Sequence, residues 1–188
     1  MKMPPTFLIL TLICATMTAQ PKSTHISEQH VFNLETDEPA VQHSVVLSDA
    51  ELAVLAQDDL MRQELDQDPP IAKLSREGLE AAVVHLGVPQ ERDLIVVGAG
   101  RPFIGANVGP FWVIRDLPTG PQVVLSVVTL ALTIQNTRFH GLRNIEVFAA
   151  TAPEGSTTSF RFDGRKYISY RQSSKQLARF TRPRKPIA

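Results

Sequence analysis

The chain of 188 residues contains one cysteine, Cys14, and one tryptophan, Trp112. A single cysteine forms no intramolecular disulfide, and it cannot build a zinc site from thiolates. The fold must therefore depend on its hydrophobic core. An apolar content of 43% can supply such a core in one ordinary domain.

Sequence motifs of common enzymes are absent or incomplete. No Gly-x-Ser-x-Gly motif for a serine nucleophile occurs. The run 94–100 resembles the beginning of a dinucleotide-binding loop, but Phe103 stands where a third small residue is required. The run 105–110, which contains glycines and a proline, cannot open the helix that such a loop needs. We therefore expect no nucleotide cofactor, and we predict that Gly98 and Gly100 begin a loop between two neighbouring antiparallel strands.

No apolar run is long enough to span a bilayer comfortably, but a shorter one lies near the N-terminus. Lys2 precedes the apolar residues 7–15, and small and polar residues follow up to Ala19. This order is typical of an export signal, which we predict at residues 1–19. Cleavage after Ala15 is the alternative. The protein is then expected to be secreted or periplasmic, with no transmembrane anchor after cleavage.

The formal net charge is zero, yet charges of opposite sign are concentrated in different regions. Residues 25–93 hold fifteen acids and four bases, a net charge of −11, whereas residues 161–188 hold nine bases and one acid, a net charge of +8. The two regions can attract each other, or the basic end can meet an anionic partner. We predict a disordered basic tail at 172–188, with polyanion binding as its alternative role. Nucleic acid is not an expected partner.

Two helices are predicted in the first half of the chain. Ser48 and Glu51 have the spacing of a capping box, which predicts the start of a helix. Leucines along one face predict that this helix continues for about four turns and ends before Pro69. Ser75 is the candidate N-cap of a second helix. Its apolar stripe consists of Leu79, Ala82, Val83 and Leu86, and Gly87 marks its end.

After residue 93 the sequence is typical of strands. Asp163 and Gly164 lie between alternating runs and predict a hairpin. The β-branched run 123–134 changes the phase of its alternation, which predicts a bulge or a tight turn near Val127. Further strand candidates are residues 94–97, 111–115 and 144–150, and a turn is predicted at 116–120. Residues 20–44 are expected to form a flexible polar segment, with one short strand candidate at 30–34.

These elements predict an α+β fold in a single domain at 45–171. Two N-terminal helices pack on an antiparallel sheet of five to seven strands.

Four residues are candidates for contact with a ligand or partner. Trp112 is predicted to anchor the core, with an exposed ligand platform as the alternative, and Arg115 follows it on the same strand. His140 lies in a loop, and Asn144 begins the strand after it. No catalytic or metal site is assigned.

Other polar residues are interpreted without a site. His25, His30 and His43 match no metal-ligand spacing, so we interpret them as part of a solvated arm. Asp58 and Asp59 are expected on an exposed helix face, where they interact with water.

From Asp93 to Arg171 the order of features resembles that of small exported bacterial proteins of uncharacterised function. The matching stretches are Asp93–Gly98, Gly105–Arg115 with its Trp-Val-Ile-Arg strand, the double strand 123–134, His140–Ile145 and Phe160–Tyr167. The fourth stretch is similar to the turn of FG-GAP-type β repeats, and the last is similar to a closing Phe-Asp-Gly hairpin. The resemblance implies export and a small antiparallel sheet. Asn144 replaces the acid that is usual in the repeat, so calcium is not expected.

Export and the lack of a coherent catalytic set predict a non-enzymatic protein that binds a protein or envelope partner, as an inhibitor-like or accessory factor. The alternative is an exported hydrolase in which His140 works with Asp116 or Glu146 as an acid/base pair.

Overall fold

The computed structural model describes residues 28–36, 38–66, 74–98, 103, 108–151 and 154–176. The described helices are α1 (Asp49–Ala56) and α2 (Asp59–Leu65). The described strands are β1 (Val31–Asn33), β2 (Leu79–Val84), β3 (Asp93–Gly98), β4 (Gly109–Leu117), β5 (Gly120–Thr129), β6 (Ala131–Phe139), β7 (Leu142–Thr151), β8 (Glu154–Phe162) and β9 (Tyr167–Gln176). The predicted signal at 1–19 and residues 177–188 of the predicted tail lie outside the described residues.

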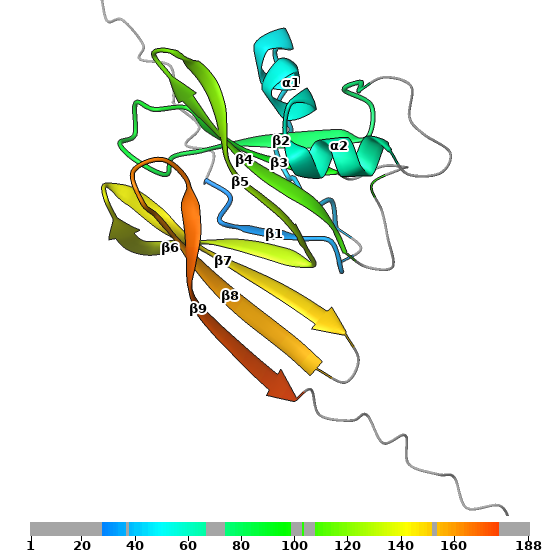
Figure 1. Ribbon diagram of the computed structural model, residues 1–188, viewed down its shortest axis with the longest axis vertical. Coiled ribbons are helices and arrows are strands. Elements are labelled where there is room, and N and C mark those ends of the chain that lie inside the picture. Colours follow the sequence, from blue (N-terminus) through cyan, green and yellow to red (C-terminus); the bar gives the residue numbers. More distant parts are fainter. Residues whose placement is uncertain are drawn as a thin grey trace, which may run out of the picture.

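The strands form two antiparallel sheets that pack against each other (Figure 1). One sheet has the order β2-β3-β4-β5, and the other has the order β1-β6-β7-β8-β9. The prediction of a single sheet of five to seven strands is therefore wrong, whereas antiparallel strands with α+β content are confirmed. The larger core takes side chains from both sheets, among them Phe32, Ile95, Val97, Phe111, Leu132, Ile145 and Phe162.

The two helices lie on the other face of the four-stranded sheet (Figure 1). There Leu55 and Met61 join Leu94, Val96 and Trp112 in a second core. Alternate residues of β3 thus meet different cores, and all six residues of this strand are buried. Burial on both faces explains why the sequence of β3 is continuously apolar rather than alternating. Neither described helix is long and apolar enough to cross a membrane.

The long helix predicted from Ser48 is divided into two. Its capping box is confirmed: the Ser48 amide donates to Glu51 Oε2 over 2.6 Å, and the Glu51 amide donates to Ser48 Oγ over 3.2 Å. The helix ends at Ala56, however, and Asp58 has extended backbone angles (φ −72°, ψ 139°). Asp58 is the N-cap of α2 and accepts a hydrogen bond from the Met61 amide, so the local capping interaction explains the break.

The second predicted helix, from Ser75, is wrong because its apolar stripe belongs to β2. Ala81 contacts the helix-side core, while Ala82 and Val84 contact the core between the sheets. This is the period of two that a strand requires. The apolar residues of so short a segment fit a helical spacing as well, and pairing with β3 along the whole strand decides between the two structures.

The apolar run 123–134 passes from one sheet to the other. The register between β4 and β5 shifts by one residue at Val124, which is a bulge, and Leu130 separates β5 from β6. The buried Leu130 donates its amide to the Phe148 carbonyl and accepts from the Leu34 amide, both over 3.0 Å. The predicted change of phase near Val127 thus has two causes, which are the bulge at Val124 and the change of sheet at Leu130.

Three other predictions are confirmed and one is corrected. Residues 30–34 contain β1, residues 116–120 contain the β4–β5 turn, and β8 and β9 form a hairpin around Gly164, whose φ is +105°. The predicted disordered tail begins too early, because residues 172–176 continue β9 and pair with β8.

Gly98 ends β3 in the antiparallel four-stranded sheet. As predicted, β3 and β4 are antiparallel neighbours. A Cβ atom at Gly98 would lie 2.6 Å from Phe103 Cβ and 2.8 Å from Pro110 Cγ. Close packing therefore requires a glycine at this position.

Candidate functional site

The structure separates the four candidate residues into two pairs. Trp112 is fully buried beneath the helices, where it packs edge-to-face against Phe103 with 6.1 Å between ring centroids. This position confirms the core-anchor interpretation. The Arg115 guanidinium lies between two acids and donates a hydrogen bond to each. Its Nε is 3.2 Å from Asp93 Oδ1, and its Nη2 is 2.6 Å from Glu91 Oε2. Burial raises the pKa of Asp93, although the Leu86 amide and the Arg115 guanidinium act in the opposite direction. The charge of Arg115 is therefore balanced by Asp93 and Glu91 within the protein.

His140, in the β6–β7 turn, and Asn144, near the start of β7, lie at the same end of the five-stranded sheet. There the Arg161 guanidinium lies 4.5 Å from the centroid of the Phe139 ring and 5.5 Å from that of the Tyr170 ring. The His140 ring stacks on Phe139 with 4.3 Å between centroids and 16° between planes. We call Phe139, His140, Asn144, Arg161 and Tyr170 the aromatic–arginine cluster. Its aromatic members are unusually open to solvent, since Phe139 is 37% exposed and Tyr170 is 46% exposed.

Strand alternation and register bring the aromatic–arginine cluster together. Phe162 is buried in the core between the sheets and Phe160 packs against that core, so Arg161 between them points to the outer face. The pairing of Ile145 with Phe160, continued by one residue, places Asn144 opposite Arg161. A register shift between β8 and β9 at this level adds Tyr170 as an extra residue on β9.

His140 has an uncommon backbone conformation in the β6–β7 turn. Its φ is +47°, and the φ of Gly141 is +83°. Positive φ at both central residues is the pattern of a type I′ turn, which favours Asn-Gly over His-Gly. His140 is the only non-glycine residue with positive φ in the described part of the chain. A histidine here costs stability, so its side chain is a candidate for a function.

Two polar atoms of the aromatic–arginine cluster are buried without a hydrogen-bond partner. Asn144 is 8% exposed and its Nδ2 donates to Thr137 Oγ1 over 2.9 Å, but its Oδ1 accepts nothing. The Nε of Arg161 is likewise unpartnered. Arg161 also forms no ion pair with a described residue, and its guanidinium lies over the rings of Phe139 and Tyr170. Buried polar groups are normally satisfied, so these two atoms are an exception beneath the surface of the cluster, and their burial keeps them out of a ligand's reach.

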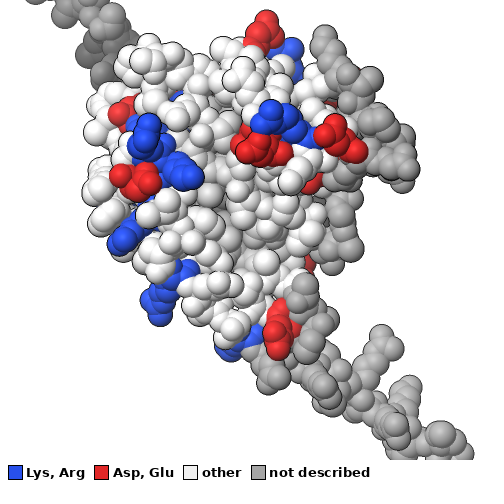
Figure 2. All heavy atoms as spheres, in the orientation of Figure 1, with Lys and Arg blue, Asp and Glu red and all other residues white. Residues whose placement is uncertain are grey.

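The cluster lies in a basic part of the surface. Residues 131–176 hold seven bases and three acids, whereas residues 49–66 hold six acids and one base. Figure 2 shows basic side chains in a row along the β8–β9 hairpin and acidic side chains over the helices. Asp163, an acid of this hairpin, accepts hydrogen bonds from the Lys166 and Arg165 amides, which hold its pKa below the usual value. Its charge is thus partly engaged by its own turn.

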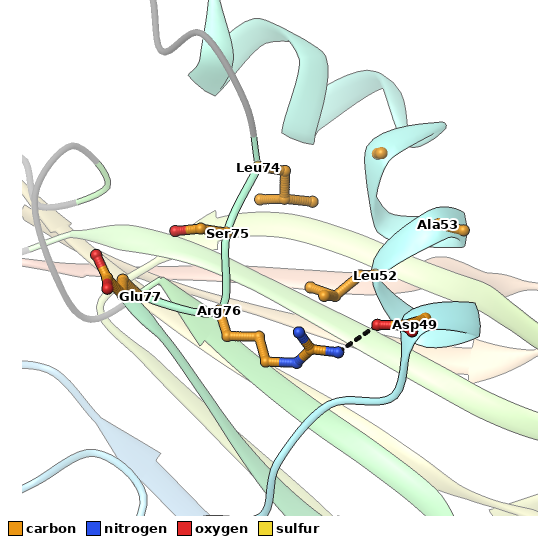
Figure 3. Close-up of a pocket in the computed structure, with 8 residues that line it drawn as sticks. Asp49, Leu52, Ala53, Leu74, Ser75, Arg76 and Glu77 are labelled. Atoms are coloured by element: carbon orange, nitrogen blue, oxygen red, sulfur yellow. Dashed lines mark hydrogen bonds and ion pairs between the residues drawn. The ribbon is translucent and has the colours of Figure 1, made fainter.

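A mainly apolar hollow of about 610 Å³ lies between α1 and residues 74–77 (Figure 3). Leu52 and Leu74 point into it, while Arg76 crosses to Asp49 and also donates to the Leu47 carbonyl over 2.8 Å. The arginine that a ligand would need is therefore already occupied. A second hollow, of about 460 Å³, lies between α2 and the β8–β9 hairpin and is bordered by Asp58, Ser126 and Lys166. Asp58 is occupied as well, because it binds Trp112, Ser126 and the α2 amide.

The acid/base pair of the hydrolase hypothesis is not formed by the described residues. No carboxylate among them lies within 4.0 Å of His140. Glu146 lies four residues beyond Leu142 on β7, which is about 14 Å along a strand. The described part of the chain also contains no group of three His, Cys, Asp or Glu side chains that could hold a metal ion.

The sequence identified His140 and Asn144, but not the residues that complete the cluster. The alternation Phe160-Arg161-Phe162 contains the signal for an outward arginine. Tyr170 could not be assigned to the same face, because the β8–β9 bulge that places it there has no sequence signature. The structure also corrects the interpretation of Asp58 as a solvated residue, since three hydrogen bonds hold its carboxylate. Asp59 is exposed, as predicted.

Comparison with known proteins adds no relative. No family model matches the chain, and no curated protein or solved structure matches it significantly.

Proposed function

We propose that this chain is an exported, non-enzymatic binding protein and that the aromatic–arginine cluster is its contact surface. The observation that carries the proposal is Arg161, which lies between the exposed rings of Phe139 and Tyr170 and has no carboxylate partner among the described residues. Exposed aromatic and arginine side chains are the groups that contribute most binding energy at protein surfaces. The apolar segment at 7–15 supports export.

A rigid support favours recognition over chemistry at this surface. The five residues are held by three neighbouring pairs of antiparallel strands, β6–β7, β7–β8 and β8–β9. Such a site presents its side chains in a fixed arrangement, which lowers the entropy that binding costs. The polar groups present are an amide, a guanidinium, a phenol and an imidazole with no carboxylate of the described residues within 4.0 Å.

A capture experiment with an envelope extract tests this proposal. The immobilised protein is compared with the double variant Arg161→Gln/Tyr170→Ala and with the control Arg62→Gln/Val46→Ala, which changes an exposed arginine and an exposed apolar residue elsewhere. We expect a component that the wild type and the control retain and the cluster variant loses. Equal capture by all three proteins, or turnover of a small substrate by the wild type, would contradict the proposal.

A further inference from the structure

We propose that the ligand of the aromatic–arginine cluster is an acidic polysaccharide, a sugar polymer that carries carboxylates such as those of uronic acids. This inference rests on the proposed function and names the class of its ligand. It requires two complementary groups on the protein: a cation for the carboxylate and an aromatic surface for the sugar ring.

Arg161 is the cation at the centre of the cluster. Phe139 and Tyr170 hold its planar guanidinium in place, so little side-chain entropy remains to be lost on binding. Its outer nitrogens form no hydrogen bond to a described residue, and a carboxylate can accept two parallel N–H bonds from such a fork.

Tyr170 supplies the second requirement, because its exposed ring lies beside the Arg161 guanidinium. A sugar acid carries its carboxylate on a ring, so one residue of the polymer can meet both Tyr170 and Arg161. The ring of Tyr170, 46% exposed, offers an electron-rich face to the polarised C–H groups of a sugar ring.

The surroundings favour a polymer over a single sugar. Arg171 and Lys175 follow Tyr170 on β9, are exposed, and form no ion pair with another described residue. From Tyr167 to Lys175 the strand extends about 26 Å, long enough for several sugar residues to lie beside it. The acidic helices repel the same polymer, so the electric field of the molecule directs it to the five-stranded sheet.

Calorimetric titration of the purified chain with hexagalacturonate tests the inference. Maltohexaose serves as the neutral probe and a twelve-nucleotide oligothymidylate as a different polyanion. We expect hexagalacturonate to bind, maltohexaose not to bind, and the affinity for hexagalacturonate to fall as salt is raised. Arg161→Lys keeps the charge but loses the planar fork, and should weaken binding about tenfold. Tyr170→Ala should weaken it by a similar factor, whereas Arg62→Lys should leave it unchanged.

Three outcomes would overturn the inference. They are no binding of hexagalacturonate, equal affinity of Arg161→Lys and wild type, or tighter binding of the oligothymidylate. If cluster-dependent capture from the envelope extract persists while hexagalacturonate fails, only the ligand class is wrong. If cluster-dependent capture is also absent, the proposed function fails with it. Thermal unfolding of each variant separates loss of binding from loss of fold.

Discussion

The indole Nε1 of Trp112 donates a hydrogen bond to Asp58 Oδ1 over 2.9 Å and so joins β4 to the first residue before α2. The other oxygen of Asp58 accepts from Ser126 Oγ of β5 over 2.6 Å. One carboxylate therefore caps a helix and fixes that helix on two strands.

Replacing this carboxylate should destabilise the protein strongly. Asp58→Ala removes the cap of α2 and leaves the buried Trp112 N–H without a partner, so we expect a loss of about 2–4 kcal/mol in the free energy of unfolding. Urea denaturation measures the loss. The neighbouring Asp59→Ala, an exposed position, should change stability by less than about 0.5 kcal/mol. Equal effects of the two substitutions would contradict the structure.

Glu51 should make stability depend on pH. Burial raises the pKa of Glu51, but the hydrogen bond from the Ser48 amide and the Arg92 guanidinium outweigh it, so the folded-state pKa lies below the ordinary 4.5. A lowered carboxyl pKa contributes stability above pH 4.5, and this contribution is lost as pH falls through the folded pKa. Glu51→Gln should therefore cost about 1 kcal/mol at pH 7 and clearly less at pH 3 in parallel urea titrations. A cost that does not change with pH would show that the charge is unimportant.

The glycine at the end of β3 is a packing requirement that can be tested directly. Gly98→Ala would drive a methyl group into Phe103 and Pro110, and we expect a loss of about 1–3 kcal/mol. The control Gly120→Ala has no atom within 4 Å of its Cβ and pays only for its φ of +110°. Thermal unfolding compares the two variants, and an unchanged midpoint for Gly98→Ala would contradict the close packing.

His140 should show opposite effects on stability and on binding. Asparagine tolerates positive φ better than histidine, so His140→Asn should raise the free energy of unfolding by about 0.5 kcal/mol. The same change removes the ring that stacks on Phe139 and should weaken capture of the envelope component. The exposed His43→Asn serves as a control that alters neither property. A His140→Asn variant that is destabilised would show that the turn is not strained.

Local signals in the sequence predicted much of this fold. The capping box at Ser48 and Glu51, the Asp163-Gly164 hairpin and the apolar run of β3 each depend on interactions within a few residues. The errors arose where distant contacts decide. Residues 79–84 fit both a helix and a strand until pairing with β3 is known. The division into two sheets depends on a change of sheet at Leu130. The sequence gives no signal for this change, because Leu130 lies within a continuous apolar run.

The candidate site shows the same limit. His140 was identified as a histidine in a predicted loop, and Asn144 through the resemblance to FG-GAP-type repeats, in which an acid is usual at its position. Arg161 is their neighbour only through the β7–β8 register, and Tyr170 only through a bulge between β8 and β9. Trp112 was noticed as the single tryptophan of the chain. The structure buries it beneath α2, so it is not an exposed platform.

The passage of the chain through Leu130 has a mechanical consequence. Because a single residue separates β5 from β6, a force that peels one layer of the sandwich acts at once on the other. The two layers are therefore expected to melt as one unit rather than in succession. An inserted flexible linker after Thr129 would remove this link but leave the core that both sheets share, so a single calorimetric transition should remain.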